Sequence, residues 1–175
     1  MDELITTSSV DYTRRKSLYE KLGDGCCHLG NYDKAIEYYL NMLDCADLNN
    51  ERGKSLIPIY VSLYQTYKDN KQYDQALKYL WKEYELNKDE PKEAFSTLCS
   101  IAEICELQMQ SFWTIQDIYQ KAKHHAAKAG DARLKLEKIV YARLRKLHIK
   151  HDMNVLAEEL VQEAISKGKI LYVYA

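Results

Sequence analysis

The chain has 175 residues, of which 25 are Lys or Arg and 26 are Asp or Glu, so its formal net charge is −1. This balance excludes an overall polyelectrolyte character. No apolar run approaches the roughly 18 residues that a membrane-spanning helix needs, and two prolines and six glycines leave little room for long linkers. We therefore expect one compact domain or a short repeat array, with no membrane span.

The five cysteines favour an intracellular, reduced compartment. Their number is odd, and four of them fall on apolar helical positions. The start of the chain, Met1-Asp-Glu, lacks the basic residues and the apolar run of a secretory signal.

One stretch of sequence returns along the chain. Residues 22–43 and 63–84 both carry a Tyr-Asp-x-Ala core that follows a polar turn and opens a helix. Ala35 in the first copy and Ala76 in the second are 41 residues apart. A helix–turn–helix unit that repeats at this length indicates a solenoid, and solenoids usually bind other proteins rather than catalyse reactions.

The first pair of helices is predicted over residues 11–48. Asp11 is a candidate N-cap, and Gly30-Asn31 ends the first helix, because Gly and Asn tolerate the left-handed conformation that a helix end needs. Apolar residues recur every three or four positions, which indicates one inward face on each helix. The inward stripe predicted for the first helix is Tyr12, Leu18, Tyr19, Leu22 and Cys26.

The second pair is predicted over residues 55–86 and the third over residues 92–129. Pro58 fits the first turn of a helix, where its missing N–H costs nothing, so we expect Ser55 to be the N-cap. Pro91 is likewise well placed at the start of the third pair.

The later part of the chain keeps the helical stripe but loses the repeated core. Residues 112–115 replace the Tyr-Asp-x-Ala pattern, although Ile115 lies 39 residues after Ala76. A fourth pair is predicted over residues 132–167. The remaining tail, residues 168–175, is apolar and strand-prone, so we expect it either to pack on the end of the array or to mark a chain that stops short of its natural end.

The pairs resemble tetratricopeptide repeats. That family places an aromatic residue and Leu-Gly on the first helix, and Gly, Tyr, Ala and an aromatic residue around the second. The matching residues of the first pair are Tyr19, Leu22, Gly23, Gly30, Tyr32, Ala35 and Tyr39. The resemblance implies one all-α array over residues 1–175, a right-handed superhelix of about four helical hairpins whose groove is lined by the first helices.

The period of about 40 residues is longer than the usual tetratricopeptide length of about 34. Long repeats of this kind occur in cell-polarity adaptors, kinesin light chains and Tonsoku-like proteins. Residues 53–86, followed by residues 91–108, are most similar to the repeat region of Tonsoku-like proteins. This implies a nuclear, non-enzymatic scaffold in homologous recombination at damaged replication forks. A cytoplasmic adaptor of the polarity or kinesin-light-chain type is the alternative.

The family pattern also places ten candidate partner-binding residues in the groove. Glu20 and Asp24 would repel a peptide's C-terminal carboxylate, so we expect instead a protein segment with basic and apolar residues. The groove candidates are Glu20, Asp24, Cys27, His28, Val61, Gln65, Lys68, Ser100, Ile104 and Gln108.

Residues 121–150 carry ten Lys or Arg against Asp131 and Glu137. The basic residues fall on several sides of the helices, which favours a diffuse, solvated face. A nucleic-acid-binding module that uses this face is the alternative function. The candidates are Lys135, Lys138, Arg143, Arg145, Lys146 and Lys150.

We predict no metal site, no cofactor and no catalytic residue. Cys26-Cys27-His28 and His148-x-x-His151 lack the paired spacing of a structural zinc site. Cys27 and His28 are neighbours on a helix and point apart, so they do not form a nucleophile and base.

Overall fold

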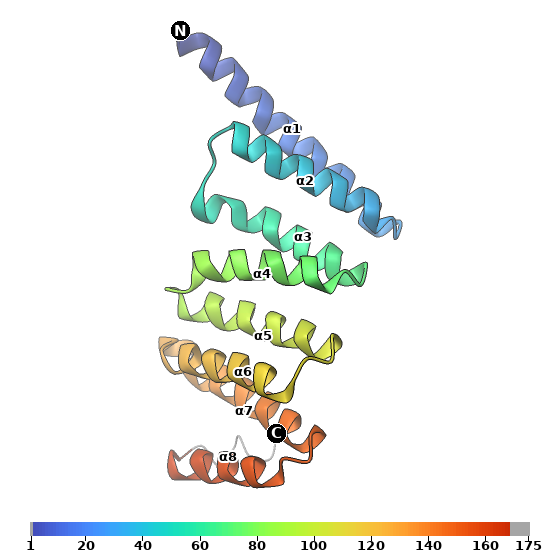
Figure 1. Ribbon diagram of the computed structural model, residues 1–175. Helices are drawn as coiled ribbons and strands as arrows, with labels where there is room; N and C mark the ends of the chain where they lie inside the picture. The colour runs from blue at the N-terminus through green and yellow to red at the C-terminus, as the bar shows by residue number, and fades with distance from the viewer. Residues whose placement is uncertain (1, 169–175) are drawn as a thin grey trace. The chain divides into compact units, whose positions relative to one another are not determined.

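The computed structural model describes the backbone of residues 2–168 and the side chains of residues 11–168. This part of the chain is built from α-helices joined by short turns, which confirms the all-α prediction (Figure 1). No helix among the described residues is both long and apolar enough to cross a membrane. The predicted tail beyond Gly168 lies outside the described residues. The helices are α1 (Asp2–His28), α2 (Tyr32–Leu48), α3 (Ile57–Asp69), α4 (Tyr73–Asn87), α5 (Pro91–Leu107), α6 (Phe112–Ala127), α7 (Arg133–Lys150) and α8 (Asn154–Ser166).

The chain divides into two compact units, residues 1–86 and residues 87–175. Unit 1 holds the hairpins α1/α2 and α3/α4, and unit 2 holds α5/α6 and α7/α8. These four hairpins correspond to the four predicted helix pairs. That both units form one continuous array stays a prediction.

The start of the first helix differs from the sequence prediction. α1 begins at Asp2, so Asp11 is an interior residue of a 27-residue helix and not an N-cap. Asp11 pairs instead with Arg15 one turn later, at 2.7 Å, and such i,i+4 pairs let a charged residue occupy an exposed helix interior. Leu18 and Leu22 are 60% and 47% exposed, so the predicted inward stripe is wrong at these two positions.

The first helix ends at the predicted Gly30-Asn31 turn, and Gly or Asn follows several other helices. The backbone has a positive φ at Gly30, Asn50, Gly130 and Gly168, which Gly and Asn adopt more readily than other residues. Pro58 lies in the first turn of α3 as expected. The N-cap position is Leu56 and not Ser55, and its side chain makes no capping bond, because Gly53–Leu56 first form a 3-10 turn.

The α1/α2 hairpin closes by packing a tyrosine ring against a glycine. Tyr39 of α2 is 3% exposed, and a Cβ added to Gly23 of α1 would lie 2.5 Å from its ring. Only glycine therefore lets the ring approach the α1 backbone this closely. In the α3/α4 hairpin the positions equivalent to Gly23 and Tyr39, 41 residues later, are Tyr64 and the fully buried Leu80. There the larger of the two residues lies on the first helix of the hairpin.

Aromatic rings form the centre of the α3/α4 hairpin. The Tyr79 ring lies 5.8 Å from the rings of both Tyr60 and Tyr67, and it is stacked on the latter. Lys82 Nζ lies 5.1 Å from the Tyr79 ring centroid, close enough for a cation–π contact. Tyr60 and Tyr67 are both buried, so their rings belong to the core of this hairpin.

Three hairpins also bury a tyrosine whose hydroxyl donates to a carboxylate of the partner helix. Burial, together with the neighbouring carboxylate, raises the pKa of Tyr39 and Tyr119 well above the usual value, so both hydroxyls keep the proton they donate. The three bonds are Tyr39 to Asp24 at 2.6 Å, Tyr119 to Glu106 at 2.8 Å, and Tyr141 to Glu163 at 3.0 Å.

Replacing Gly23 with Ala should destabilise the protein, because the new Cβ would collide with the Tyr39 ring. We expect the free energy of unfolding, measured by urea denaturation, to fall by about 1–3 kcal/mol. Gly25→Ala is the matched control, since a Cβ at Gly25 meets nothing within 4 Å. That variant should be neutral or more stable by up to about 1 kcal/mol. Equal effects of the two substitutions would contradict the close fit at Gly23.

Candidate interaction surfaces

The groove residues predicted for unit 1 lie on α1 and α3, the first helices of its two hairpins. Cys27 joins the two helices there, because its Sγ lies 3.5 Å from Thr66 Oγ1 and 3.8 Å from the Tyr39 hydroxyl. Cys27 and Lys68 are half-buried. The exposed members of the predicted set are Glu20, Asp24, His28, Val61 and Gln65.

Asp24 has a structural partner, although the sequence analysis placed it in the groove as a charge available to a ligand. Its Oδ1 accepts the Tyr39 hydroxyl at 2.6 Å, so the carboxylate satisfies a buried donor of α2. Both residues are exposed, but among the described residues no such bond holds the Glu20 carboxylate, one turn earlier on α1. Of the two acidic groove residues, Glu20 is therefore the better probe of ligand binding.

The predicted groove residues of unit 2 are less exposed. Ile104 is 1% exposed and therefore belongs to the core and not to a groove surface. The reason is that α5 carries buried residues on most of its circumference, as helices inside a core do. Ser100 is half-buried and donates to the Ser96 carbonyl, and the half-buried Gln108 accepts a hydrogen bond from Gln110.

The basic candidates on α7 form a single face, in contrast to the diffuse distribution predicted. At 3.6 residues per turn the exposed cations fall within an arc of about 140°, opposite the arc that holds the buried Val140, Leu144 and Leu147. Arg143 lies at the margin of this arc, half-buried beside the Tyr119 hydroxyl. The exposed cations, called the basic face from here on, are Lys135, Lys138, Arg145, Lys146 and Lys150.

Acidic residues border the basic face on two sides. A hollow of about 320 Å³ brings Glu103 and Glu106 of α5 together with Lys146 and Lys150 of α7. On the other side, a hollow of about 660 Å³ between α7 and α8 is lined by Arg145, Ile149, Glu158 and Glu159, among others. The basic face is therefore a narrow strip, about one helix wide.

A third hollow was missed by the sequence analysis. It has a volume of about 590 Å³, lies on the α3/α4 hairpin, and includes Tyr60, Lys78, Trp81, Lys82 and Leu86. Trp81 is 37% exposed. The sequence signal was present, because Lys78, Trp81 and Lys82 recur at helical spacing outside the apolar stripe.

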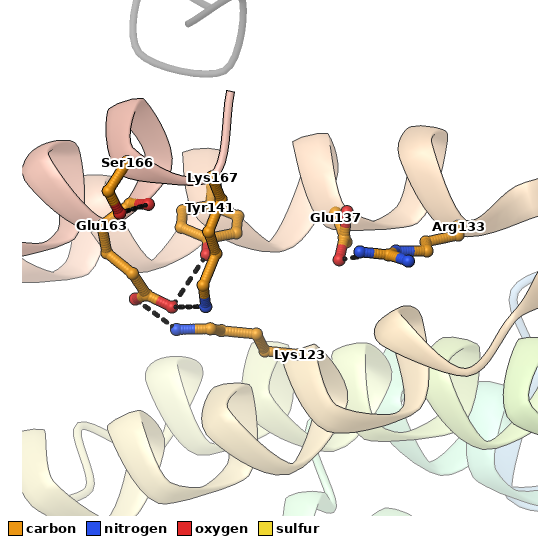
Figure 2. Close-up of polar contacts among 7 residues, drawn as sticks. All are labelled: Lys123, Arg133, Glu137, Tyr141, Glu163, Ser166 and Lys167. Carbon is orange, nitrogen blue, oxygen red and sulfur yellow. Dashed lines mark hydrogen bonds and ion pairs between the residues drawn. The ribbon is translucent and has the colours of Figure 1, made fainter. Parts of the chain in front are cut away.

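Glu163 of α8 binds side chains from two other helices and from the end of its own (Figure 2). It accepts bonds from Lys123 of α6 at 2.5 Å, from Tyr141 of α7 at 3.0 Å, and from Lys167 at 2.5 Å. Burial of the carboxylate disfavours its charge, but the bonds from Lys123 and Lys167 outweigh this and lower its pKa to about 2. This network fixes α8 against α6 and α7.

The buried cysteines and the histidine pair of α7 occupy structural positions. Burial raises the pKa of the Cys99 and Cys105 thiols to about 11, which disfavours the nucleophilic thiolate. His148 is 3% exposed, and its ring and that of His151 lie 5.7 and 5.4 Å from the Phe112 ring. Among the side chains that the structure describes, no three His, Cys, Asp or Glu residues are grouped to hold a metal ion.

The chain is similar to a segment of several Tonsoku-like proteins. It is 64% identical over 168 residues to the Tonsoku-like protein of Drosophila melanogaster, a match that covers 96% of this chain and 12% of that protein. For the Tonsoku-like protein of Danio rerio the identity is 37% over 114 residues, covering 65% of this chain and 8% of the relative. The Tonsoku-like protein of Bos taurus is 28% identical over 149 residues, a match that covers 85% of this chain and 11% of the relative. The chain therefore spans 12% or less of these relatives. No family model matches it.

Two solved structures share the fold. The crystal structure of BtubC (BKLC) from P. vanneervenii has a TM-score of 0.69 at 16% identity and covers 91% of this chain and 65% of its own. A kinesin light chain of Podosopora anserina with nearly identical TPR-like repeats has a TM-score of 0.67 at 13% identity, covering 94% and 83%. Such low identities show the fold alone. The predicted tetratricopeptide-like fold is thereby confirmed, as is the resemblance to the repeat region of Tonsoku-like proteins.

Replacing Glu163 with Gln should destabilise the protein at neutral pH and not at strongly acidic pH. The carboxyl has a pKa of about 2 in the folded state and about 4.5 as an unperturbed group, so its charge stabilises the fold above about pH 4.5. This contribution is lost as the pH falls from there towards 2. Because the carboxylate is partly exposed, we expect the Glu163→Gln substitution to lower the free energy of unfolding, measured in urea at pH 7, by about 1–2 kcal/mol.

Glu159→Gln is the control, because Glu159 is an exposed carboxylate on the same helix. Its effect should be small at every pH. A Glu163→Gln variant as stable as the wild type at pH 7 would show that the network around Glu163 contributes nothing.

Proposed function

We propose that this chain, a long-repeat tetratricopeptide protein most similar to the repeat region of Tonsoku-like proteins, is a non-enzymatic scaffold that binds protein partners. The observation that carries the proposal is the 64% identity over 168 residues to a Tonsoku-like protein. Helical-hairpin repeats support it physically, because stacked hairpins present extended surfaces suited to protein segments.

The relatives also support a finer proposal. The chain acts in the nucleus, as part of a Tonsoku-like factor in the repair of double-strand breaks by homologous recombination at replication forks. Because the matched segment is 12% of the Drosophila melanogaster relative, its contribution is the binding of a partner and not the whole activity of such a factor.

The exposed residues of α1 and α3 in unit 1 are the proposed binding surface. Glu20 supplies a negative charge there, and Val61, which is 38% exposed, supplies an apolar contact. Gln65 adds a polar side chain that donates to Asp69 at 3.1 Å, which leaves its carbonyl oxygen available to a ligand. A partner segment with basic and apolar side chains complements this set.

The tagged chain, incubated with nuclear extract from dividing cells, should recover partner proteins that Glu20→Arg reduces at least about fivefold, because reversing the charge repels a basic segment. Glu37→Arg is the matched control, since Glu37 is exposed on α2 and the charge change is identical. Quantitative mass spectrometry of the recovered proteins measures both. We expect replication and recombination proteins among those lost with Glu20→Arg and kept with Glu37→Arg.

Two results would count against the proposal in different ways. Equal recovery with both variants would remove the α1/α3 surface as the binding site. Selective loss of proteins with no role in replication or repair would keep a scaffold but reject the nuclear repair function.

A further inference from the structure

The basic face of α7 belongs to unit 2 and shares no residue with the surface proposed above, which belongs to unit 1. We infer that the basic face binds an acidic protein segment that also carries apolar side chains. The inference rests on the charge, the apolar content and the borders of this face.

The cations of the basic face have no ion-pair partner among the side chains of residues 11–168. Among the residues that the structure describes, none of the five makes an ion pair, although other exposed cations such as Lys92 and Lys121 do. Lys146 and Lys150 are one turn apart, and like charges at this spacing destabilise a helix. The one acidic residue of α7 is Glu137, which is 3% exposed and faces the core. An external acidic ligand would relieve this repulsion.

Apolar side chains lie within the same arc of α7. Ile149 is 50% exposed, and Ile139 and Ala142 are half-buried between the cations. From Lys135 to Lys150 the face is about 22 Å long at 1.5 Å per residue, the length of a four-turn partner helix or a shorter extended segment. A ligand that uses the whole face therefore needs apolar contacts as well as carboxylates.

The borders of the basic face favour a protein segment over a nucleic acid. Glu103 and Glu106 stand beside Lys146 and Lys150 on one side, and Glu158 lies near Arg145 on the other. A nucleic-acid backbone carries a phosphate at every nucleotide and would meet these carboxylates as well as the cations. Carboxylates on one face of a narrow peptide can contact the strip alone, and the peptide's apolar side chains can pack on Ile149.

The test uses the full 175-residue chain and a fluorescein-labelled synthetic helix of about 16 residues with Glu and Leu on one face. Fluorescence anisotropy at about 50 mM salt measures its affinity. Lys146→Glu combined with Lys150→Glu should weaken binding at least about tenfold, because two attractions become repulsions. The control, Lys21→Glu combined with Lys34→Glu, makes the same charge change at exposed positions of unit 1 and should change affinity less than about twofold.

Two further substitutions test whether apolar contacts contribute to binding. Ile149→Ser in the protein and Leu→Ser in the peptide should each weaken binding by about threefold or more. Circular dichroism checks that each variant is folded, and Lys146→Gln combined with Lys150→Gln replaces the charge reversal if that variant is not.

Three outcomes would overturn the inference. The first is no binding of the acidic peptide, or equal binding by the charge-reversed and control variants. The second is tighter binding of a DNA duplex of similar length that is lost with the same charge reversal, which would assign the face to nucleic acid. The third is unchanged affinity of the Leu→Ser peptide, which would reduce the interaction to charge alone.

Discussion

When a tyrosine ring is buried between two helices, its hydroxyl is buried as well. A buried hydroxyl without a hydrogen-bond acceptor lowers the stability of the folded state by about 1–3 kcal/mol. In this protein a carboxylate of the partner helix meets that need. Tyr39 donates to Asp24 across the α1/α2 hairpin, and Tyr119, at the equivalent position of the α5/α6 hairpin, donates to Glu106. In the α3/α4 hairpin the corresponding position is Leu80, and stacked rings form its centre instead.

This constraint separates the charges that hold the fold from those that are available to partners. Asp24 and Glu163 are bound by side chains of neighbouring helices, so their charges serve the fold. Glu20 in unit 1 and the basic face of α7 in unit 2 are among the exposed charges that no such bond holds. The two surfaces differ in sign, and we propose accordingly that one binds a basic segment and the other an acidic one. A scaffold that brings together two different partners needs such a difference.

The sequence predicted the features that depend on neighbouring residues along the chain, above all the helix boundaries. Gly30 and Pro58 mark helix boundaries through their own backbone preferences, so the hairpins could be located with little error. Burial and pairing depend on side chains from other helices, which the repeat pattern does not specify. Ile104 therefore appeared to be a groove residue although it is buried, and Asp24 appeared to be available for a ligand. The arrangement of the basic face needed the structure as well, because the solvent side of α7 had to be known.

The measurement that tests the tyrosine–carboxylate constraint most directly is a double-mutant cycle of Tyr39→Phe and Asp24→Ala, followed by urea unfolding, because Ala has no side-chain acceptor. The 2.6 Å bond between these residues predicts a coupling free energy of about 1–2 kcal/mol, with the double variant losing less stability than the sum of the single losses. A coupling indistinguishable from zero would contradict the account, because the Asp24 carboxylate would then contribute nothing to holding the Tyr39 hydroxyl.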